Sequence, residues 1–119
     1  MKYMTTMKEL IVDTLIIGAG PAGLAMAGQL SHRGLSYVII EGADKIAPSW
    51  HQHYERLHLH TVSQWSHLPH LPFPKDFPLY VPKLKLVEYF NLYVERFNIR
   101  PIFNQTVVDI KRENAQWVI

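Results

Sequence analysis

The chain has 119 residues, of which 48% are hydrophobic and 18% are charged, so it has the size and composition of one ordinary domain with one core. Its net charge of +2 gives no reason to predict nucleic acid or an anionic membrane as a partner. The absence of cysteine excludes disulfides, thiolate metal sites, thiol nucleophiles and thioether-linked cofactors.

Residues 1–10 carry two lysines but no apolar run that ends in small residues, and they are predicted to be a flexible lead-in. The main apolar stretch, residues 14–27, is interrupted by Gly18, Gly20, Pro21 and Gly23, a density that a membrane-spanning helix rarely tolerates. We therefore expect a cytoplasmic protein without a membrane segment.

A strand, a helix and a second strand are predicted within residues 11–41. Residues 11–17 are rich in β-branched residues and almost continuously apolar, which is typical of a central parallel strand. Helical spacing of small and apolar residues follows in 21–33, and Gly34 is suited to end that helix. Residues 36–41 then predict the second strand. The pattern indicates an α/β fold built on a Rossmann-like β-α-β unit with a parallel sheet.

Residues 42–82 are predicted to be irregular, because they hold six of the eight prolines, which forbids a long helix. So long a stretch without regular structure is unusual in a compact domain unless it wraps a ligand or a partner, or is disordered. Its aromatic and apolar content argues against disorder.

The last third predicts one helix and a β hairpin. Residues 83–97 have the spacing of an amphipathic surface helix, with its apolar stripe formed by Val87, Phe90, Val94 and Phe97. Lys83 and Lys85 are interpreted as solvating the start of this helix. Extended segments at 102–103 and 106–111, a turn at 113–114 and a returning strand at 116–119 complete the chain.

A glycine motif joins the first predicted strand to the first predicted helix. The residues that match G-x-G-x-x-G are Gly18, Ala19, Gly20, Pro21, Ala22 and Gly23. Gly18 allows the tight turn, Gly20 lets a pyrophosphate approach the backbone, and Gly23 lets the helix lie close to the sheet. The diphosphate would meet the free N–H groups and the positive end of the helix.

Glu41 ends the second predicted strand, close to the roughly 20-residue offset at which an acidic side chain accepts hydrogen bonds from ribose hydroxyls. A carboxylate there would repel a 2′-phosphate, which disfavours NADP at this site but fits both FAD and NAD. The competing interpretation is that a glycine-rich corner serves only close packing.

Three further segments resemble the flavin-containing monooxygenases, especially the branch of the plant YUCCA-type enzymes and their bacterial relatives. They are IAPSW at 46–50, YERLHLHT at 54–61 and LPHLPFPKDFP at 68–78. The resemblance spans about residues 11–119, within the family's N-terminal FAD-binding region, and is specific because order and spacing agree.

The resemblance implies a role for each matching position. The six residues from Gly18 to Gly23 would bind the FAD diphosphate, Glu41 the adenosine ribose, and Trp50 would lie against the flavin. Arg56 and Thr61 fall where the family's chain passes the cofactor, and Val107 would offer backbone hydrogen bonds to adenine. In the family, NADPH reduces the flavin and O2 then oxidises a small-molecule substrate. Because the cofactor carries this chemistry, no catalytic residue is nominated.

Two departures from the family pattern limit what the chain is expected to do. Ala47, Pro48 and Ser49 stand where the family often has glycines, and the second glycine motif for NADPH is absent. Residues 11–119 are therefore predicted to be a partial FAD-binding domain without the NADPH domain, catalytically incomplete. Self-association is expected, because a sheet that lacks later strands exposes apolar surface.

Two alternatives remain open. The first is the NAD-binding domain of a dehydrogenase, although the long insertion after the second strand argues against it. The second is a non-catalytic remnant that acts as an interaction module through its sheet edge.

The remaining histidines and tryptophans receive structural interpretations. The seven histidines, including the pairs His51/His53 and His58/His60, are interpreted as loop and surface residues, because no third metal ligand lies at a familiar spacing. Trp65 and Trp117 are expected to pack in the core.

Overall fold

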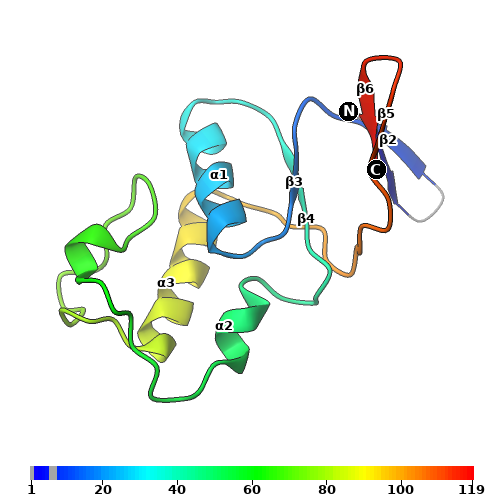
Figure 1. Cartoon of the computed structure of the whole chain (residues 1–119). Coiled ribbons are helices and arrows are strands. Elements are labelled where there is room, and N and C mark those ends of the chain that lie inside the picture. Colours follow the sequence, from blue (N-terminus) through cyan, green and yellow to red (C-terminus); the bar gives the residue numbers. More distant parts are fainter. Residues whose placement is uncertain (1, 6–7) are drawn as a thin grey trace.

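The computed structural model describes residues 2–5 and 8–119 of the chain. In chain order, its elements are β1 (Lys2–Thr5), β2 (Lys8–Ile11), β3 (Leu15–Ile17), α1 (Pro21–His32), β4 (Val38–Ile40), α2 (Pro48–Gln52), the short 3-10 helix η1 (Ser63–Trp65), α3 (Lys83–Arg96), β5 (Lys111–Glu113) and β6 (Gln116–Val118). Figure 1 shows α1, α2 and α3 on one side of β3 and β4, with the terminal hairpins on the other.

The expected β-α-β unit is confirmed. Strands β3 and β4 are parallel, with Leu15 opposite Val38 and Ile17 opposite Ile40, and α1 connects them. Ile102 forms a parallel bridge with Ile40, so the chain after α3 takes the next position in this sheet. The expected C-terminal hairpin is also confirmed, because β5 and β6 pair antiparallel.

The N-terminal part differs from the expectation. Only residues 15–17 of the predicted strand 11–17 belong to β3, whereas β2 pairs antiparallel with β1, and a bend at Asp13 separates the two segments. The range expected as a flexible lead-in therefore contains strands at 2–5 and 8–10, and residues 1 and 6–7 lie outside the described residues. A domain boundary at residue 10 stays a prediction.

Helix α1 forms where the sequence places it. Pro21 occupies the first helical turn, where its fixed φ suits the helix and its missing N–H is not needed. Gly34 follows the helix with φ +68, and the N–H of Leu35 donates to the carbonyl oxygen of Leu30 at 2.9 Å. This left-handed residue closes the helix as predicted.

The proline-rich segment 42–82 contains only the short helices α2 and η1, in agreement with the prediction that no long helix forms there. Its two arms meet at the start of α3, where the N–H of Leu59 donates to the carbonyl oxygen of Val81 at 2.9 Å. The N–H of Ser63 likewise donates to the carbonyl oxygen of Leu79 at 2.7 Å. The segment is thus an arch closed by backbone hydrogen bonds.

Helix α3 forms at 83–96, but of the predicted stripe only Phe90 and Phe97 are buried. The residues it buries are Lys83, Leu86, Tyr89, Phe90 and Tyr93, and Phe97 is buried directly after it, whereas Val87 and Val94 are only partly buried. The apolar pattern failed because tyrosine can be buried fully when its hydroxyl finds a partner. Lys83 also corrects the interpretation that it solvates the helix start, since only 8% of it is exposed.

Two buried tyrosine hydroxyls fasten the arch to α3. The hydroxyl of Tyr89 donates to the carbonyl oxygen of Leu71 at 2.6 Å, and that of Tyr93 donates to the carbonyl oxygen of Pro69 at 2.9 Å. Burial raises the pKa of Tyr89 and of Tyr93 to about 12, so both stay protonated donors at neutral pH. The core is therefore shared between α1, α3 and the arch.

The packing roles expected for two tryptophans are wrong. Trp65 is 78% exposed at the periphery of the arch, and Trp117 is 46% exposed on β6, where Arg112 lies 5.8 Å from its ring. Among the residues that the structure describes, no helix has the length and apolar character needed to span a membrane.

Candidate functional site

The turn between β3 and α1 has the geometry that its glycines predict. Gly18 adopts φ +100, and its N–H donates to the carbonyl oxygen of Ile40 at 2.7 Å, which ties the turn to β4. A Cβ on Gly23 would lie 1.9 Å from the carbonyl oxygen of Gly18, so only glycine allows α1 to start this close to the turn.

Gly20 differs from the other two glycines because no packing requires it. Within the described residues, nothing beyond its chain neighbours comes within 4 Å of the place where its Cβ would be. It is the N-cap of α1, no side chain caps that end, and the first turn carries no acidic residue. The first N–H groups of a helix have no intrahelical partner, so this open space is suited to an anion.

Glu41 lies against the glycine turn. It is 9% exposed, and its Oε1 accepts a hydrogen bond from the N–H of Ala19 at 2.9 Å, while Oε2 accepts one from the N–H of Ala43 at 2.8 Å. The parallel strands bring the acid and the glycines together at their carboxyl ends, where ligands bind in open α/β sheets. Each carboxylate oxygen can accept a further bond.

The segment that carries Val107 runs beside Glu41. The N–H of Glu41 donates to the carbonyl oxygen of Ile102, and the N–H of Gln105 donates to the carbonyl oxygen of Glu41, both at 3.0 Å. Val107 is partly buried two residues further on. The backbone positions expected near adenine and near the ribose are therefore neighbours.

Helix α2, which carries Trp50, is linked to the same turn. Ala47 precedes the helix with φ 46, and its N–H donates to the carbonyl oxygen of Ala19 at 2.9 Å. The ring of Trp50 is partly buried and forms edge contacts with His53, at 4.7 Å between centroids, and Phe90, at 6.4 Å. Glu41, Ala19 and Ala47 thus form one hydrogen-bonded chain from the acid through the glycine turn to α2.

Arg56 and Thr61 lie farther along the arch, and both are exposed. The carbonyl oxygen of Arg56 bonds to Nδ1 of His58, and the hydroxyl of Thr61 bonds to the hydroxyl of Ser66. The partners in these hydrogen bonds, His58 and Ser66, belong to the arch itself, so these bonds do not bring Arg56 and Thr61 to the glycine turn.

Sequence reasoning missed two residues that position this site. Gly28 faces Tyr93, whose hydroxyl oxygen would lie 1.8 Å from a Cβ at residue 28, so α1 and α3 approach closely there. Lys83 directs its Nζ to the carbonyl oxygens of His51 and His53 at the end of α2. A glycine inside a predicted helix is a signal that could have indicated the contact at Gly28. No sequence signal distinguishes Lys83 from a surface lysine.

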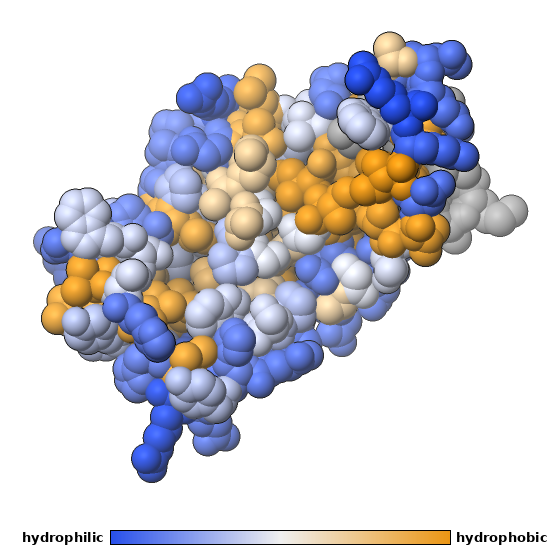
Figure 2. Space-filling model, in the orientation of Figure 1, coloured by the Kyte–Doolittle hydropathy of each residue, from blue (hydrophilic) through white to orange (hydrophobic). Residues whose placement is uncertain are grey.

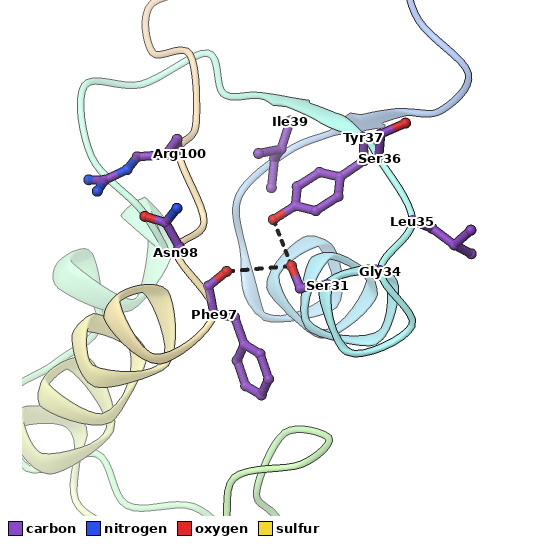
Figure 3. A pocket seen from close by; sticks show the side chains of 9 residues that line it. All are labelled: Ser31, Gly34, Leu35, Ser36, Tyr37, Ile39, Phe97, Asn98 and Arg100. Carbon is purple, nitrogen blue, oxygen red and sulfur yellow. Dashed lines mark hydrogen bonds between the residues drawn. The ribbon is translucent and has the colours of Figure 1, made fainter.

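A pocket of about 450 Å³ lies at the opposite end of α1 (Figure 3). There Ser31 stands between the hydroxyl of Tyr37, at 3.2 Å, and the carbonyl oxygen of Phe97, at 3.5 Å. This pocket contains none of the residues expected to bind a nucleotide. Nor do the described residues include a cluster of three or more histidine or carboxylate groups that could hold a metal ion.

Comparisons with known proteins relate this geometry to one family. A family model described as pyridine nucleotide-disulphide oxidoreductase matches residues 15–119. The indole-3-pyruvate monooxygenase YUCCA6 of Arabidopsis thaliana is 47% identical over 107 residues, which cover 87% of this chain and 26% of that protein. The chain thus spans about a quarter of the length of that curated relative.

Solved structures agree in fold. A flavin-containing monooxygenase from Stenotrophomonas maltophilia matches with a TM-score of 0.78 and 27% identity over 89% of this chain and 32% of that one. The bacillithiol disulfide reductase Bdr from Staphylococcus aureus matches with a TM-score of 0.79 and 21% identity over the same shares, which shows the fold alone.

Proposed function

The chain belongs to the pyridine nucleotide-disulphide oxidoreductase family, and we propose that it binds FAD as the N-terminal part of a flavin-dependent monooxygenase. The resemblance to flavin-containing monooxygenases is confirmed, and so is the partial Rossmann-like fold. A flavin cofactor follows from these relatives. The choice of FAD and the residues that bind it are the proposal.

The residues at the glycine turn fit a dinucleotide. The open space at Gly20 and the uncapped start of α1 would take the diphosphate, and Glu41 would accept hydrogen bonds from the adenosine ribose. Val107 would meet adenine through its backbone, and Trp50 would lie toward the flavin. Arg56 and Thr61 remain in the proposed cofactor path through the resemblance alone.

The activity of the whole protein is the wider part of the proposal. When bound, FAD would accept electrons from NADPH and activate O2 for oxidation of a small-molecule substrate. This chain's own residues would bind and orient FAD, and the NADPH site would lie outside residues 11–119. A cytoplasmic location and the lack of nucleic-acid partners stay predictions from composition.

The contrast between Gly20 and Gly23 carries the proposal. Both glycines belong to the same motif. A side chain at Gly23 would collide with the backbone, whereas a side chain at Gly20 would enter a space that no other described residue occupies. A glycine whose Cβ would meet no atom of the described residues, at the start of a helix without a side-chain cap, is explained by a ligand that approaches the backbone there.

The test is FAD titration of the purified chain, followed by flavin fluorescence and with NAD as competitor. We expect saturable binding that NAD does not displace, and a Kd at least about tenfold higher in Gly20→Ala, equivalent to roughly 1.4 kcal/mol. Gly20→Ala should lower the melting temperature less than Gly23→Ala does, because among the described residues its Cβ meets no neighbour and only the N-cap preference for glycine is lost.

Gly23→Ala is the matched control, since it should lower the melting temperature through its clash with Gly18. A folded chain that fails to bind FAD, or a folded Gly20→Ala variant with undiminished affinity, would contradict the proposal. Displacement of FAD by NAD would favour the dehydrogenase alternative.

A further inference from the structure

Lys83 is a buried lysine whose side chain reaches a different helix from its own. It begins α3 and is 8% exposed, and its Nζ donates to the carbonyl oxygens of His51, at 3.0 Å, and His53. A buried charge is costly unless hydrogen bonds replace its hydration. The two carbonyl oxygens supply that replacement, so the contact is specific to the end of α2.

The acceptors of these hydrogen bonds are backbone carbonyl oxygens at the C-terminal end of α2, which have no hydrogen-bond donor within the helix. Helix α2 has five residues, too few to be stable alone. Its last carbonyls have no intrahelical partners, and a cation is favourable at this negative end. Lys83 therefore supplies the C-terminal cap that the sequence of α2 does not contain.

The other end of α2 is fixed at the glycine turn. The N–H of Ala47 donates to the carbonyl oxygen of Ala19 at 2.9 Å, and Ala19 in turn donates to Glu41. Helix α2 is thus held at one end by the glycine turn and at the other by Lys83 of α3. Trp50 lies between these two ties and packs on Phe90 of α3.

The path of the backbone makes Lys83 suited to this position. Its own N–H donates to the carbonyl oxygen of Leu57 at 2.8 Å, and His58 bridges to Pro82. The arch therefore returns to α3 within a few residues of the point where it leaves α2. A side chain at the first position of α3 can then reach back across the base of the arch.

We propose that Lys83 is a positioning residue of the cofactor site, which holds α2, and through it Trp50, in the orientation that faces the flavin. The inference rests on the proposed function as far as the flavin is concerned. The fixation of Trp50 itself is a property of the chain alone and can be measured without FAD.

The chain offers a specific reporter for this fixation. Its three tryptophans are Trp50, Trp65 and Trp117, and the last two are exposed, so the double variant Trp65→Phe/Trp117→Phe leaves Trp50 as the single emitter. In this background we would compare Lys83→Met and Lys83→Arg. Lys85→Met is the matched control, because Lys85 lies on the same helix but faces Glu88 at 3.9 Å and is 44% exposed.

Lys83→Met should at least double the acrylamide quenching constant of Trp50 in the absence of FAD. It should also weaken FAD binding about tenfold and change the visible circular dichroism of the bound flavin at saturation. Lys83→Arg, which keeps a cation and several donors, should restore most of each signal. Lys85→Met should leave all three signals unchanged.

A folded Lys83→Met variant whose Trp50 quenching and flavin spectrum equal those of the parent overturns the proposal, even if its melting temperature falls, because Lys83 would then be merely structural. Should Lys83→Met fail to fold, Lys83→Gln is measured against Lys85→Gln, and an unchanged Trp50 signal there overturns the proposal equally. If the parent chain binds no FAD, the proposed function fails, and the quenching comparison still decides whether Lys83 fixes Trp50.

Discussion

Helices α1 and α3 approach each other closely at Gly28 and Tyr93. A Cβ at residue 28 would lie 1.8 Å from the hydroxyl oxygen and 2.6 Å from Cζ of Tyr93, so the ring would have to move. Moving it would also strain the hydrogen bond from Tyr93 to the carbonyl oxygen of Pro69. Glycine, whose side chain is a hydrogen atom, is therefore needed at residue 28 for the observed spacing of α1 and α3 and for the hydrogen bond between Tyr93 and the arch.

We expect Gly28→Ala to lower the free energy of unfolding by about 1–2 kcal/mol, because overpacking outweighs the roughly 1 kcal/mol by which alanine favours a helix. Tyr93→Phe should cost about 1 kcal/mol through its lost hydrogen bond. The double variant should be less destabilised than the sum of the two, as measured by urea unfolding. Simple additivity would show that the hydroxyl does not limit the contact.

His70 is an exposed residue of the arch whose ring contacts α1. Its ring stacks on His32 at 3.7 Å between centroids, and its Nε2 bonds to Oε1 of Gln29 at 2.8 Å. Desolvation, followed by the charges of His32 and Arg33, lowers the pKa of His70 below 6.5. As the pH falls, His70 therefore binds a proton at a higher pH in the unfolded chain than in the folded chain.

This contact should contribute stability that is complete above pH 6.5 and decreases below it. The melting temperature of the parent chain should therefore fall more steeply with acidification than that of His70→Asn, and asparagine tolerates the φ of +68 at this position. His60→Asn, in the exposed part of the arch, serves as the control variant. Equal slopes for the parent and His70→Asn would remove His70 as the cause.

At the scale of elements, the C-terminal end of α1 contributes to the stability of the fold through the conformation of Gly34. Gly34 has φ +68, and the place of its Cβ is open among the described residues, so any cost of substitution comes from the backbone alone. The adjoining bond from Leu35 to Leu30 closes the last turn and directs the chain into β4.

Gly34→Ala should reduce the free energy of unfolding by about 1 kcal/mol, because an L side chain disfavours the left-handed conformation. Gly34→Asn should cost less, because asparagine adopts that conformation more readily. Urea unfolding of both variants tests the order, and an equal loss in both would point to a lost contact instead.

At the scale of the whole molecule, the shape is more extended than a compact domain. The radius of gyration is 15.9 Å, compared with about 13.5 Å expected for a compact chain of this length. Figure 2 shows a broad hydrophobic area between α1 and the terminal hairpins, where Figure 1 places β3. Ile11 and Ile17 are 70% and 49% exposed, and in the described residues β3 pairs only with β4.

This uncovered edge should make the isolated chain self-associate, since unpaired strands recruit neighbours and large apolar patches favour contact. The sedimentation coefficient should rise with concentration, and Ile17→Lys should reduce that rise. Leu84→Lys, at a 75% exposed position on α3, should leave it unchanged. A monomer at every concentration would contradict the expectation.

The sequence by itself determined the parts in which local chemistry and function require the same residues. Gly18 and Gly34 specify left-handed backbone conformations that few other residues adopt, and Gly23 allows a close backbone approach. The β-branched runs around Ile16 and Ile39 specify the parallel pair. The order and spacing of the motifs indicated the family, and the density of prolines predicted that residues 42–82 contain no long helix.

Only the tertiary structure decided which polar groups could be buried. The predicted apolar stripe omits Tyr89 and Tyr93, and Lys83 is interpreted from the sequence as solvating the helix start. Each of the three is nevertheless buried, because a carbonyl oxygen of the arch or of α2 lies within reach. Those partners are 18 to 32 residues away along the chain. A local pattern contains no information about such distant acceptors, so the buried face of α3 and the anchoring of α2 became visible only after the chain had folded.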